Sequence, residues 1–550
     1  MRVGEAIGEE LRALGVEVVF GIPGVHTIEL YRGLERARIR AVTPRHEQGA
    51  GFMADGYARV SGRPGVCVLI TGPGVTNAMT PLAQAYHDSV PLLVVASTTA
   101  RDALGRGRGA LHDVPDQAAL AGAVTWFSET VTEPDSARET LRRAWASLHG
   151  GRPRPAHIAI PVDVLGLDAA AGGAPAGTSP GLVAGGAAGG GAPPAEPAQR
   201  DVERAAALLA GAERPALLLG GGAVDAGAQA TTIAERLDAP VVLTGNAKGV
   251  LPSSHPLCLG ATLPFAPVQE LLAGADAVLL AGTELSEVDW LYSGRPPRFD
   301  GRVVRIDIDP AQLAGGATPE IGLVGDAAAT LGRIGAALGE RLPGPRTPGA
   351  KQVRTALAGL DWTEDSRAHL PWLDAIDAAL PADRIVALDS TQPAYTAHHY
   401  LPAARPRSWL APYGLGTLGP ALPMAVGAKL AAPDRPVLVL AGDGGLLFTL
   451  SELATAVDLG LALPVVVWDN RGYGEIRDSF DRAGAPRVGT ETTAHDLLAI
   501  AAGFGCATAA PGTPDELTAA IGVALAADRP TVIRVAALPS GQTPLRRNQA

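Results

Sequence analysis

The chain has 550 residues, a formal net charge of -11 and 47% hydrophobic residues, which gives enough apolar material for the cores of three or four domains. Such acidity argues against binding to nucleic acid, which needs a basic surface. No run of about 18 apolar residues is present to span a bilayer, and the first residues lack the layout of a signal peptide. We therefore expect a cytoplasmic protein without membrane or nucleic-acid partners. The three cysteines (Cys67, Cys258 and Cys506) are scattered in apolar surroundings, which argues against a disulfide framework or a zinc site.

Short runs rich in Val, Ile and Leu recur along the chain, and a helix-like stretch follows each of them. Near-continuous apolar strands that alternate with helices are typical of parallel sheets covered on both faces. The pattern therefore predicts an α/β fold with doubly wound parallel sheets. The predicted strands are 16–20, 66–70, 91–96, 157–160, 216–219, 240–244, 277–280, 303–308, 385–388, 436–440, 464–468 and 531–535.

Two breaks divide the chain. Residues 169–199 are almost all Ala, Gly and Pro, and they cannot bury enough side chain to offset the chain entropy, so we predict a linker. Residues 339–349 are rich in Pro and Gly and predict a second linker. The breaks leave three α/β domains at 1–168, 200–338 and 350–540, with a loose tail after Pro539. The first and third domains are similar in size, which suggests an ancient repeat.

Two polar turns follow neighbouring predicted strands of the third domain. Strand 436–440 runs into Gly442-Asp443-Gly444-Gly445, and strand 464–468 runs into Asp469-Asn470. Glycines let the backbone approach a phosphate closely, and the N-terminus of a following helix offers free N–H groups. Magnesium prefers oxygen ligands, which the Asp443 carboxylate, the Asn470 amide and a Gly472 carbonyl would supply. Parallel strands bring such turns together at one sheet edge.

The spacing of the two turns is more specific than either turn alone. Many strand–helix turns contain Gly-Asp-Gly, but here Asn470 stands 27 positions after Asp443. This pair resembles the signature of the thiamine-diphosphate-dependent 2-oxo-acid decarboxylase and acetolactate synthase superfamily, which usually has Asn in place of Asp469. The resemblance implies thiamine diphosphate and Mg²⁺ as cofactors, with Asp443, Asn470 and Gly472 as metal ligands. It also implies cofactor contacts from Gly442, Asp443, Gly444, Gly445, Asn470, Gly472 and Tyr473.

Glu47 lies in the stretch 45–59, which is followed by a glycine-rich run at 72–74. An isolated Glu at a helix start is usually exposed, but this stretch together with 21–24 resembles the pyrimidine-binding domain of the same superfamily. There, a buried carboxylic acid hydrogen-bonded to the pyrimidine N1′ promotes the imino tautomer, and the thiazolium is the electron sink. The resemblance implies that Glu47 is this catalytic acid. Further cofactor contacts are expected from Pro23, Gly24, Thr71 and Asn77.

A glycine-rich stretch at 413–423 precedes the metal turn and contains Leu418. A core leucine in such a turn is common, but beside the other motifs Leu418 matches the bulky residue that the family wedges between the two cofactor rings. The resemblance implies that Gly416 and Leu418 bind the pyrimidine edge and that Gln392 touches the diphosphate. In this family the acid and the metal clamp come from different subunits, which implies a homodimer or homotetramer with its active site at a subunit interface.

The middle domain matches the landmarks of the family at 219–222 and 305–310. In acetolactate synthases this domain holds FAD. The Arg-Phe pair that usually follows the central strand is missing from 282–287, so we expect no FAD. A dinucleotide site at the glycines 220–222 remains an alternative, although a full Gly-x-Gly-x-x-Gly pattern is absent.

The proton donors of well-known decarboxylases are absent from the expected positions. His112 falls where acetolactate synthases place a Gln near the substrate, and it is our candidate acid or base; a loop histidine without a role is the alternative. Glu475 stands where relatives place a small or apolar residue, and its carboxylate would suit a guanidinium group. The alternative is a surface ion pair of Glu475 with Arg477 or Arg471.

The runs 21–27, 111–113 and 473–477 resemble the 5-guanidino-2-oxopentanoate decarboxylases. The resemblance implies a small-molecule 2-oxo acid as substrate, with contacts from Val25, Leu111, His112, Glu475 and Ile476. Decarboxylation of such an acid is the main hypothesis, and acyloin-forming carboligation of the acetolactate synthase type is the second. A non-catalytic homologue that only binds the cofactor is the third, against which the intact Glu47, Asp443 and Asn470 argue.

Overall fold

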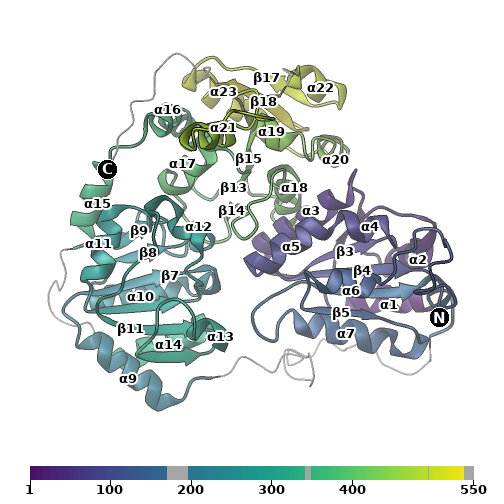
Figure 1. The fold of residues 1–550 in the computed structure, drawn as a ribbon, viewed down its shortest axis with the longest axis horizontal. Coiled ribbons are helices and arrows are strands. Elements are labelled where there is room, and N and C mark those ends of the chain that lie inside the picture. The colour runs from purple at the N-terminus through teal and green to yellow at the C-terminus, as the bar shows by residue number, and fades with distance from the viewer. Residues whose placement is uncertain (170–195, 341–348, 493–494, 538–550) are drawn as a thin grey trace.

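The computed structural model describes residues 1–169, 196–340, 349–492 and 495–537. It contains three six-stranded sheets in which neighbouring strands run parallel, with helices packed around them (Figure 1). This confirms the predicted α/β class with doubly wound parallel sheets. The predicted linker residues 170–195 and 341–348 and the tail after Pro539 lie outside the described residues. Within the described ranges, no helix combines the length and the apolar character needed to cross a membrane.

The first domain has the strand order β2-β1-β3-β4-β6-β5. Its central strands β3 and β4 are buried along their whole length, as expected for strands covered on both faces. The strands are β1 (Val18–Phe20), β2 (Arg40–Val42), β3 (Gly65–Leu69), β4 (Leu92–Thr98), β5 (Phe127–Thr130) and β6 (Ala156–Pro161). The helices are α1 (Val3–Ala13), η1 (Val25–Thr27), α2 (Ile28–Arg36), α3 (Glu47–Ser61), α4 (Pro73–Asn77), α5 (Met79–Asp88), α6 (Gln117–Gly122), η2 (Pro134–Ser136), α7 (Ala137–Ser147) and α8 (Val162–Leu165).

The middle domain has the order β12-β11-β10-β7-β8-β9, which is the doubly wound order of a dinucleotide-binding fold. The strands are β7 (Pro215–Leu219), β8 (Val241–Leu243), β9 (Cys258–Gly260), β10 (Ala277–Ala281), β11 (Arg302–Asp307) and β12 (Ile321–Val324). The helices are α9 (Gln199–Ala210), η3 (Gly221–Ala223), α10 (Gly227–Leu237), η4 (Gly245–Ala247), α11 (Ala266–Gly274), α12 (Glu287–Trp290), η5 (Leu291–Ser293), α13 (Pro310–Leu313) and α14 (Ala327–Leu338).

The third domain has the order β14-β13-β15-β16-β18-β17, which repeats the order of the first domain when strands are counted from each domain start. The strands are β13 (Ile385–Leu388), β14 (Trp409–Leu410), β15 (Val437–Gly442), β16 (Pro464–Asp469), β17 (Ala507–Ala509) and β18 (Thr531–Ala536). The helices are α15 (Ala350–Ala358), α16 (Glu364–Ala379), α17 (Gln392–Tyr400), α18 (Ala421–Ala431), α19 (Asp443–Leu446), α20 (Glu452–Asp458), α21 (Gly474–Arg482), α22 (Leu497–Gly503) and α23 (Pro514–Leu525).

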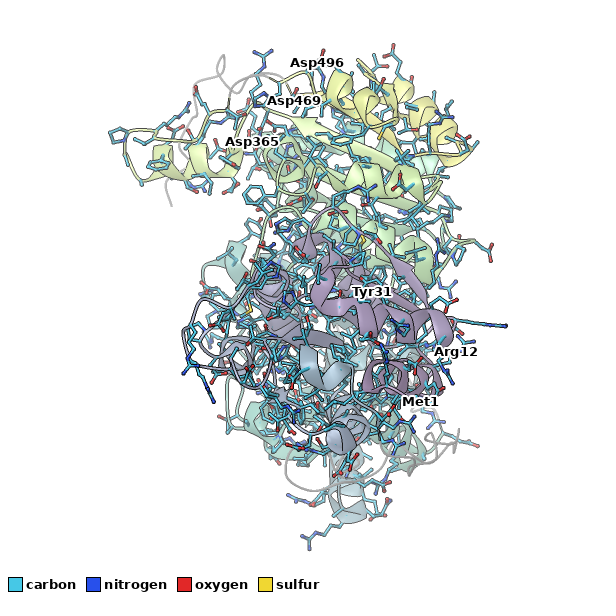
Figure 2. All side chains as sticks on the ribbon, turned by 90° about the vertical axis from the view of Figure 1, so that its right-hand side faces the viewer. Met1, Arg12, Tyr31, Asp365, Asp469 and Asp496 are labelled. Carbon is cyan, nitrogen blue, oxygen red and sulfur yellow. The ribbon has the colours of Figure 1, made fainter. Side chains whose placement is uncertain are left out.

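The first and third domains share one hydrophobic core, which forms where α3 packs on α18. Figure 1 shows these helices side by side, and Figure 2 shows the third domain, with Asp365 and Asp469, stacked on the first domain, with Tyr31. Two glycines permit the close approach. A Cβ atom at Gly427 would lie 1.9 Å from the Met53 carbonyl oxygen, and one at Gly56 would lie 2.1 Å from the Met424 carbonyl oxygen. Only hydrogen at these positions lets the helix backbones touch.

We expect Gly427→Ala to destabilise the protein, because the added methyl group must push two helix backbones apart. The cost should be about 1–3 kcal/mol, which is typical of overpacking a core. Thermal unfolding followed by circular dichroism would report it as a lower apparent Tm. The matched control is Gly522→Ala on α23, where an added Cβ atom would meet nothing within 4 Å. This substitution should leave the Tm unchanged or raise it slightly. Equal Tm values for both variants would contradict the close-contact argument.

Candidate active site

The strand order of the third sheet reverses between β13 and β15, so the loops after these strands diverge and leave room for a ligand. Asp389 follows β13 and Asp443 follows β15, while Asn470 follows the next strand, β16. The predicted metal and diphosphate residues therefore meet at the carboxyl edge of one sheet.

The carboxylate of Asp443 is buried and anchors the turn after β16. It accepts hydrogen bonds from the backbone N–H of Asn470 at 3.3 Å and of Gly472 at 2.9 Å. Burial is the main cause that raises the pKa of Asp443, and the neighbouring Asp469 raises it further. The backbone of the turn after β16 is thus hydrogen-bonded to the carboxylate that we predicted as a metal ligand.

The side-chain amide of Asn470 completes a set of converging oxygen atoms. Its Nδ2 donates to Gln392 Oε1 at 3.2 Å. Its other terminal atom lies 3.2 Å from Asp443 Oδ1 and 2.8 Å from the Gly472 carbonyl oxygen. A nitrogen there would donate to both oxygens, whereas an oxygen there would face both of them, as ligands do around a bound cation. Facing oxygens repel one another unless a cation lies between them, and a carboxylate, an amide and a carbonyl are ligands that magnesium accepts. The donor set fits Mg²⁺.

Gly444 and Gly445, which follow β15, lie so close to neighbouring side chains that a larger residue would not fit at either position. A Cβ atom at Gly444 would lie 2.9 Å from the ring of Tyr473, and one at Gly445 would lie 2.8 Å from the carboxyl group of Asp389. Asp389 is buried, and burial raises its pKa to about 7. The neighbouring side chains therefore leave no space for anything larger than hydrogen at Gly444 and Gly445.

The loop 413–419 carries Gly416, which has a φ of +66°, and Leu418. A carboxylate holds each end of this loop. Gly414 N donates to Oδ1 of Asp88 at 2.9 Å, and Gly419 N donates to both oxygens of Asp389 at 3.1 and 3.0 Å. Asp88 comes from α5 of the first domain, and no sequence motif pointed to it, because its role depends on contact between domains.

In the first domain, Glu47 is the first residue of α3 and is only 9% exposed. Its carboxylate accepts a hydrogen bond from Nδ2 of Asn77 at 2.9 Å, so the structure brings these two predicted residues together. Asn77 ends α4, which starts directly after the turn that follows β3. Pro23 and Gly24 follow β1, the neighbour of β3, so both lie at the same sheet edge.

The loop between β4 and α6 brings His112 to this edge. A Cβ atom at Gly72 would lie 2.4 Å from the His112 carbonyl oxygen. The ring centroids of His112 and His26 are 5.1 Å apart, and the Nδ1 atoms of both are buried without a partner among the described residues. Burial, followed by the nearby His112, lowers the pKa of His26. A histidine pair was not part of the sequence prediction.

Thr71 is buried and does not face open space. Its hydroxyl donates to Gln117 Oε1 at 3.0 Å, and the Gly72 N–H donates to the same oxygen at 3.1 Å. Gln117 Nε2 donates to the Ser97 carbonyl at 3.0 Å. Gln117 therefore ties the turn after β3 to β4, a role that the sequence analysis missed because the two segments lie far apart in the chain.

Helix α21 starts directly after the turn that follows β16, and it carries Glu475 and the exposed Ile476. Glu475 forms an ion pair of 2.7 Å with Arg482, about two helical turns away, rather than with Arg471 or Arg477. Arg477 instead donates to the Asn470 carbonyl at 3.0 Å. Asp478 accepts a hydrogen bond from Gln392 Nε2 at 2.6 Å, so Gln392 links α21 to Asn470.

The predicted residues thus form two groups, one on each of the first and third domains. Among the described residues, no hydrogen bond joins a member of one group to a member of the other. Apolar side chains are exposed beside both groups: Val25 and Leu111 are 79% and 67% exposed on the first domain, and Leu415, Phe448 and Ile476 are exposed on the third. Exposed apolar side chains are typical of surfaces that a partner or ligand covers where they gather in one patch.

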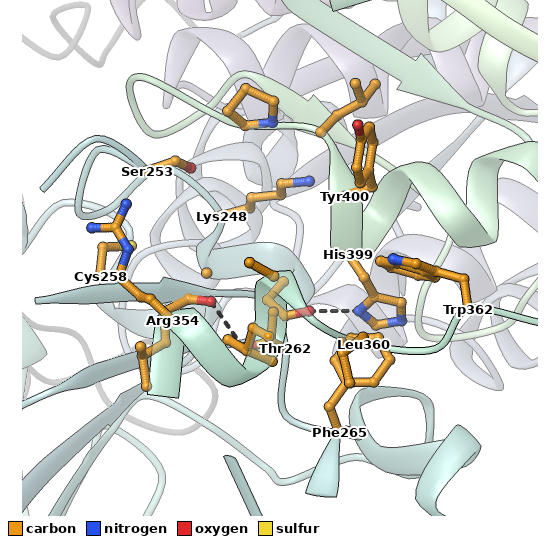
Figure 3. Close-up of a pocket in the computed structure, with 17 residues that line it drawn as sticks. Lys248, Ser253, Cys258, Thr262, Phe265, Arg354, Leu360, Trp362, His399 and Tyr400 are labelled. Carbon is orange, nitrogen blue, oxygen red and sulfur yellow. Dashed lines mark hydrogen bonds between the residues drawn. The ribbon is translucent and has the colours of Figure 1, made fainter. Parts of the chain in front are cut away.

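A cavity of about 280 Å³ lies away from both groups, between the middle and third domains (Figure 3). Its one buried cation, Lys248, donates to the carbonyl oxygens of Ala397 and His398 at 3.2 and 2.8 Å, and burial lowers its pKa. None of the predicted site residues lines this cavity. It is therefore not the predicted site.

Family models match all three domains of the chain. The model described as "Thiamine pyrophosphate enzyme, N-terminal TPP binding domain" matches residues 1–120, the central domain of the same family matches residues 202–334, and the C-terminal TPP binding domain matches residues 389–535. Thiamine pyrophosphate is another name for thiamine diphosphate. Both groups of predicted site residues lie in or next to segments that the two binding-domain models cover.

Curated relatives align over nearly the whole chain. A probable 2-ketoarginine decarboxylase of Pseudomonas aeruginosa is 44% identical over 529 residues, which are 94% of this chain and 90% of the relative. The acetolactate synthase isozyme 1 large subunit of Escherichia coli is 31% identical, covering 92% of this chain and 88% of the relative. An acetolactate synthase large subunit of Corynebacterium glutamicum is 30% identical, covering 97% and 86%. The chain therefore belongs to the thiamine diphosphate-dependent enzyme family whose members include decarboxylases and acetolactate synthases, and thiamine diphosphate is its cofactor.

Proposed function

We propose that this enzyme decarboxylates a 2-oxo acid with a cationic side chain, such as 5-guanidino-2-oxopentanoate. The observation that carries this substrate proposal is the carboxylate of Glu475 on α21, next to the metal turn. It already binds the guanidinium group of Arg482 at 2.7 Å at a half-exposed position, and a substrate guanidinium could take the place of that partner. The 44% identity to a probable 2-ketoarginine decarboxylase supports the same substrate class.

Thiamine diphosphate supplies the nucleophilic carbon and the electron sink for loss of carbon dioxide. The chain must supply a proton at the pyrimidine N1′, and we assign this task to Glu47. Glu47 is buried at the start of α3, and the Asn77 amide fixes the orientation of its carboxyl group through a hydrogen bond of 2.9 Å. His112 would then serve as the acid or base nearest to the substrate, since its Nδ1 is buried without a partner among the described residues.

We infer that Asp443, Asn470 and the Gly472 carbonyl hold Mg²⁺, and that Gly442, Gly444, Gly445 and Tyr473 border the diphosphate. The converging oxygens of these ligands support the metal assignment. Gln392 would act through Asn470, because it accepts the hydrogen bond that turns the Asn470 oxygen toward Asp443. Leu418 and Gly416 would hold the pyrimidine edge on the loop that Asp88 and Asp389 anchor.

We further propose that the active site forms between two subunits of a homodimer or homotetramer. The two groups of site residues share no hydrogen bond among the described residues, and the exposed Val25, Leu111 and Ile476 would be covered by the second subunit. A cytoplasmic location agrees with three buried cysteines that form no disulfide.

The second candidate function is acyloin-forming carboligation, which the 31% identity to an acetolactate synthase supports.

The contacts of the middle domain favour an enzyme that does not bind FAD, unlike the acetolactate synthases. A Cβ atom at Gly220 would lie 2.2 Å from the Gly282 carbonyl oxygen, so the glycine turn after β7 packs directly on the loop after β10. Arg152 of the first domain forms an ion pair with Glu284 beside it. We therefore expect the middle domain to work without FAD.

The Glu47→Gln variant should lose decarboxylation by about 10²–10⁴-fold, because an amide cannot exchange a proton with the pyrimidine nitrogen. Affinity for thiamine diphosphate with Mg²⁺ should stay close to that of the wild type, since the third domain supplies the clamp. Steady-state kinetics and fluorescence titration measure the two quantities. Glu17→Gln, an exposed change in the same domain, is the control, and wild-type turnover in Glu47→Gln would remove the catalytic assignment.

Removal of a metal ligand should weaken cofactor retention. In Asp443→Ala we expect the Mg²⁺-dependent affinity for thiamine diphosphate to fall at least about tenfold, because one charged oxygen ligand is lost. Titration of the cofactor at fixed Mg²⁺, after treatment with EDTA, measures the change. The control Asp469→Asn changes the neighbouring carboxylate and should keep an affinity for thiamine diphosphate close to that of the wild type. An equal loss of affinity in both variants would contradict a direct role for Asp443.

A substrate panel tests the function itself. Wild-type enzyme should release carbon dioxide from 5-guanidino-2-oxopentanoate with a higher kcat/KM than from pyruvate or 2-oxopentanoate, and the product should be the aldehyde. Glu475→Gln should lower kcat/KM for the guanidino acid by roughly 10–100-fold, the usual value of a charge-assisted contact, without affecting the neutral acids. Arg482→Gln should not lower kcat/KM for the guanidino acid, because this change removes the ion-pair partner of Glu475 and leaves its carboxylate free for the substrate. Predominant acyloin formation, or equal losses for all acids in Glu475→Gln, would refute the proposal.

A further inference from the structure

Glu452, the first residue of α20, is a fully buried carboxylate of the third domain that points into the first domain. Its oxygens accept hydrogen bonds from the backbone N–H of Arg45, at 3.1 Å to each oxygen, and from the N–H of His46 at 3.0 Å. The hydroxyl of Thr455 donates to it at 2.7 Å. A buried carboxylate is held firmly by such charge-assisted contacts.

The two N–H groups that Glu452 binds belong to the residues directly before Glu47. The fit continues into the first turn of α3, where a Cβ atom at Gly49 would lie 2.3 Å from Oε1 of Glu452. The other end of α20 holds the same segment, because Asp458 forms an ion pair with the side chain of Arg45. Figure 1 shows α20 near α3 of the first domain.

We propose that Glu452 is a positioning residue that sets the location of Glu47. Without its acceptor oxygens, the N–H groups of Arg45 and His46 lose their partners and the start of α3 is free to shift. The Glu47 carboxyl group would then move relative to the pyrimidine N1′. The inference rests on the proposed role of Glu47, and it assigns Glu452 no contact with cofactor or substrate.

In the proposed dimer, the contact of Glu452 with Arg45 and His46 means that each third domain would contribute to two active sites. Its metal clamp, at Asp443 and Asn470, would serve one active site. Its Glu452 would hold the acid that the first domain of the same chain offers to the other site. A change at Glu452 should therefore alter the proton-transfer step and leave the diphosphate and metal contacts intact.

The test compares Glu452→Ala, Glu452→Gln and the control Asp458→Ala, which removes only the ion pair of α20 with Arg45. Amide hydrogen exchange of residues 43–49 in the cofactor-free protein should rise in Glu452→Ala. In the loaded enzyme, kcat should fall by roughly 10–100-fold, as expected for a misplaced catalytic group. KM for the 2-oxo acid and the affinity for thiamine diphosphate with Mg²⁺ should change less than about twofold, since kcat alone depends on the Glu47 geometry.

The Gln variant keeps one oxygen that can accept both N–H groups, so it should restore kcat to within about threefold of the wild type. Wild-type kcat in a folded Glu452→Ala protein, a Gln variant as slow as the Ala variant, or an equal loss in Asp458→Ala would each overturn the proposal. If Glu452→Ala does not fold, Gly49→Ala takes its place, because the added methyl group displaces the carboxylate without removing it. Wild-type kcat in folded Gly49→Ala would then refute the inference.

The two proposals fail in different ways. If Glu47→Gln retains turnover, the catalytic assignment of Glu47 is wrong and the proposed function loses its acid. If Glu47→Gln is inactive while Glu452→Ala turns over at the wild-type rate, only the positioning role of Glu452 is wrong. Relative rates across the 2-oxo acid panel should be the same in Glu452→Gln and the wild type, since Glu452 does not contact the substrate.

Discussion

The packing of α3 on α18 is the contact on which the arrangement of both site groups depends. Gly56 and Gly427 let the two helix backbones touch, and the side chains around them form one core shared by the first and third domains. Helix α3 begins with Glu47, and α18 follows the loop that carries Leu418. A close backbone contact cannot slide without steric clash, because packed interiors leave no free volume. The helices therefore fix Glu47 and the loop that carries Leu418 relative to each other within one chain.

The first and third domains use the same strand order and place their functional residues at the same topological position. In each sheet the order reverses between the first and third strand of the domain, and the turns after those two strands carry the predicted residues. Pro23 and Thr71 lie there in one domain, and Asp389 and Asp443 in the other. Ligands bind at such points because the diverging loops leave a crevice. The shared order agrees with an origin of both domains by duplication.

The residues that the sequence identified are those that sit in short, contiguous motifs. Asp443 and Asn470 stand at a spacing, and Glu47 in a run of residues, that resemble motifs of the family, so they could be identified from the sequence. Asp88 and Glu452 were missed for a common reason: each is a carboxylate that accepts hydrogen bonds from backbone N–H groups of another domain. Such a contact leaves no pattern in the sequence, since any residue except proline can supply the N–H group. The sequence also did not point to Arg482 as the ion-pair partner of Glu475, because that contact depends on the course of α21.

The sequence by itself determined the fold class, the family and the central strands of all three sheets, because strands buried on both faces must be continuously apolar. The six strands that it did not predict, β2, β5, β9, β12, β14 and β17, are the six edges of the sheets. Edge strands are short and can be half exposed, as in Arg40–Val42, so their composition carries little signal. Only the tertiary structure decided these edges and the contacts between domains, because both arise from surfaces that meet after the individual elements have formed.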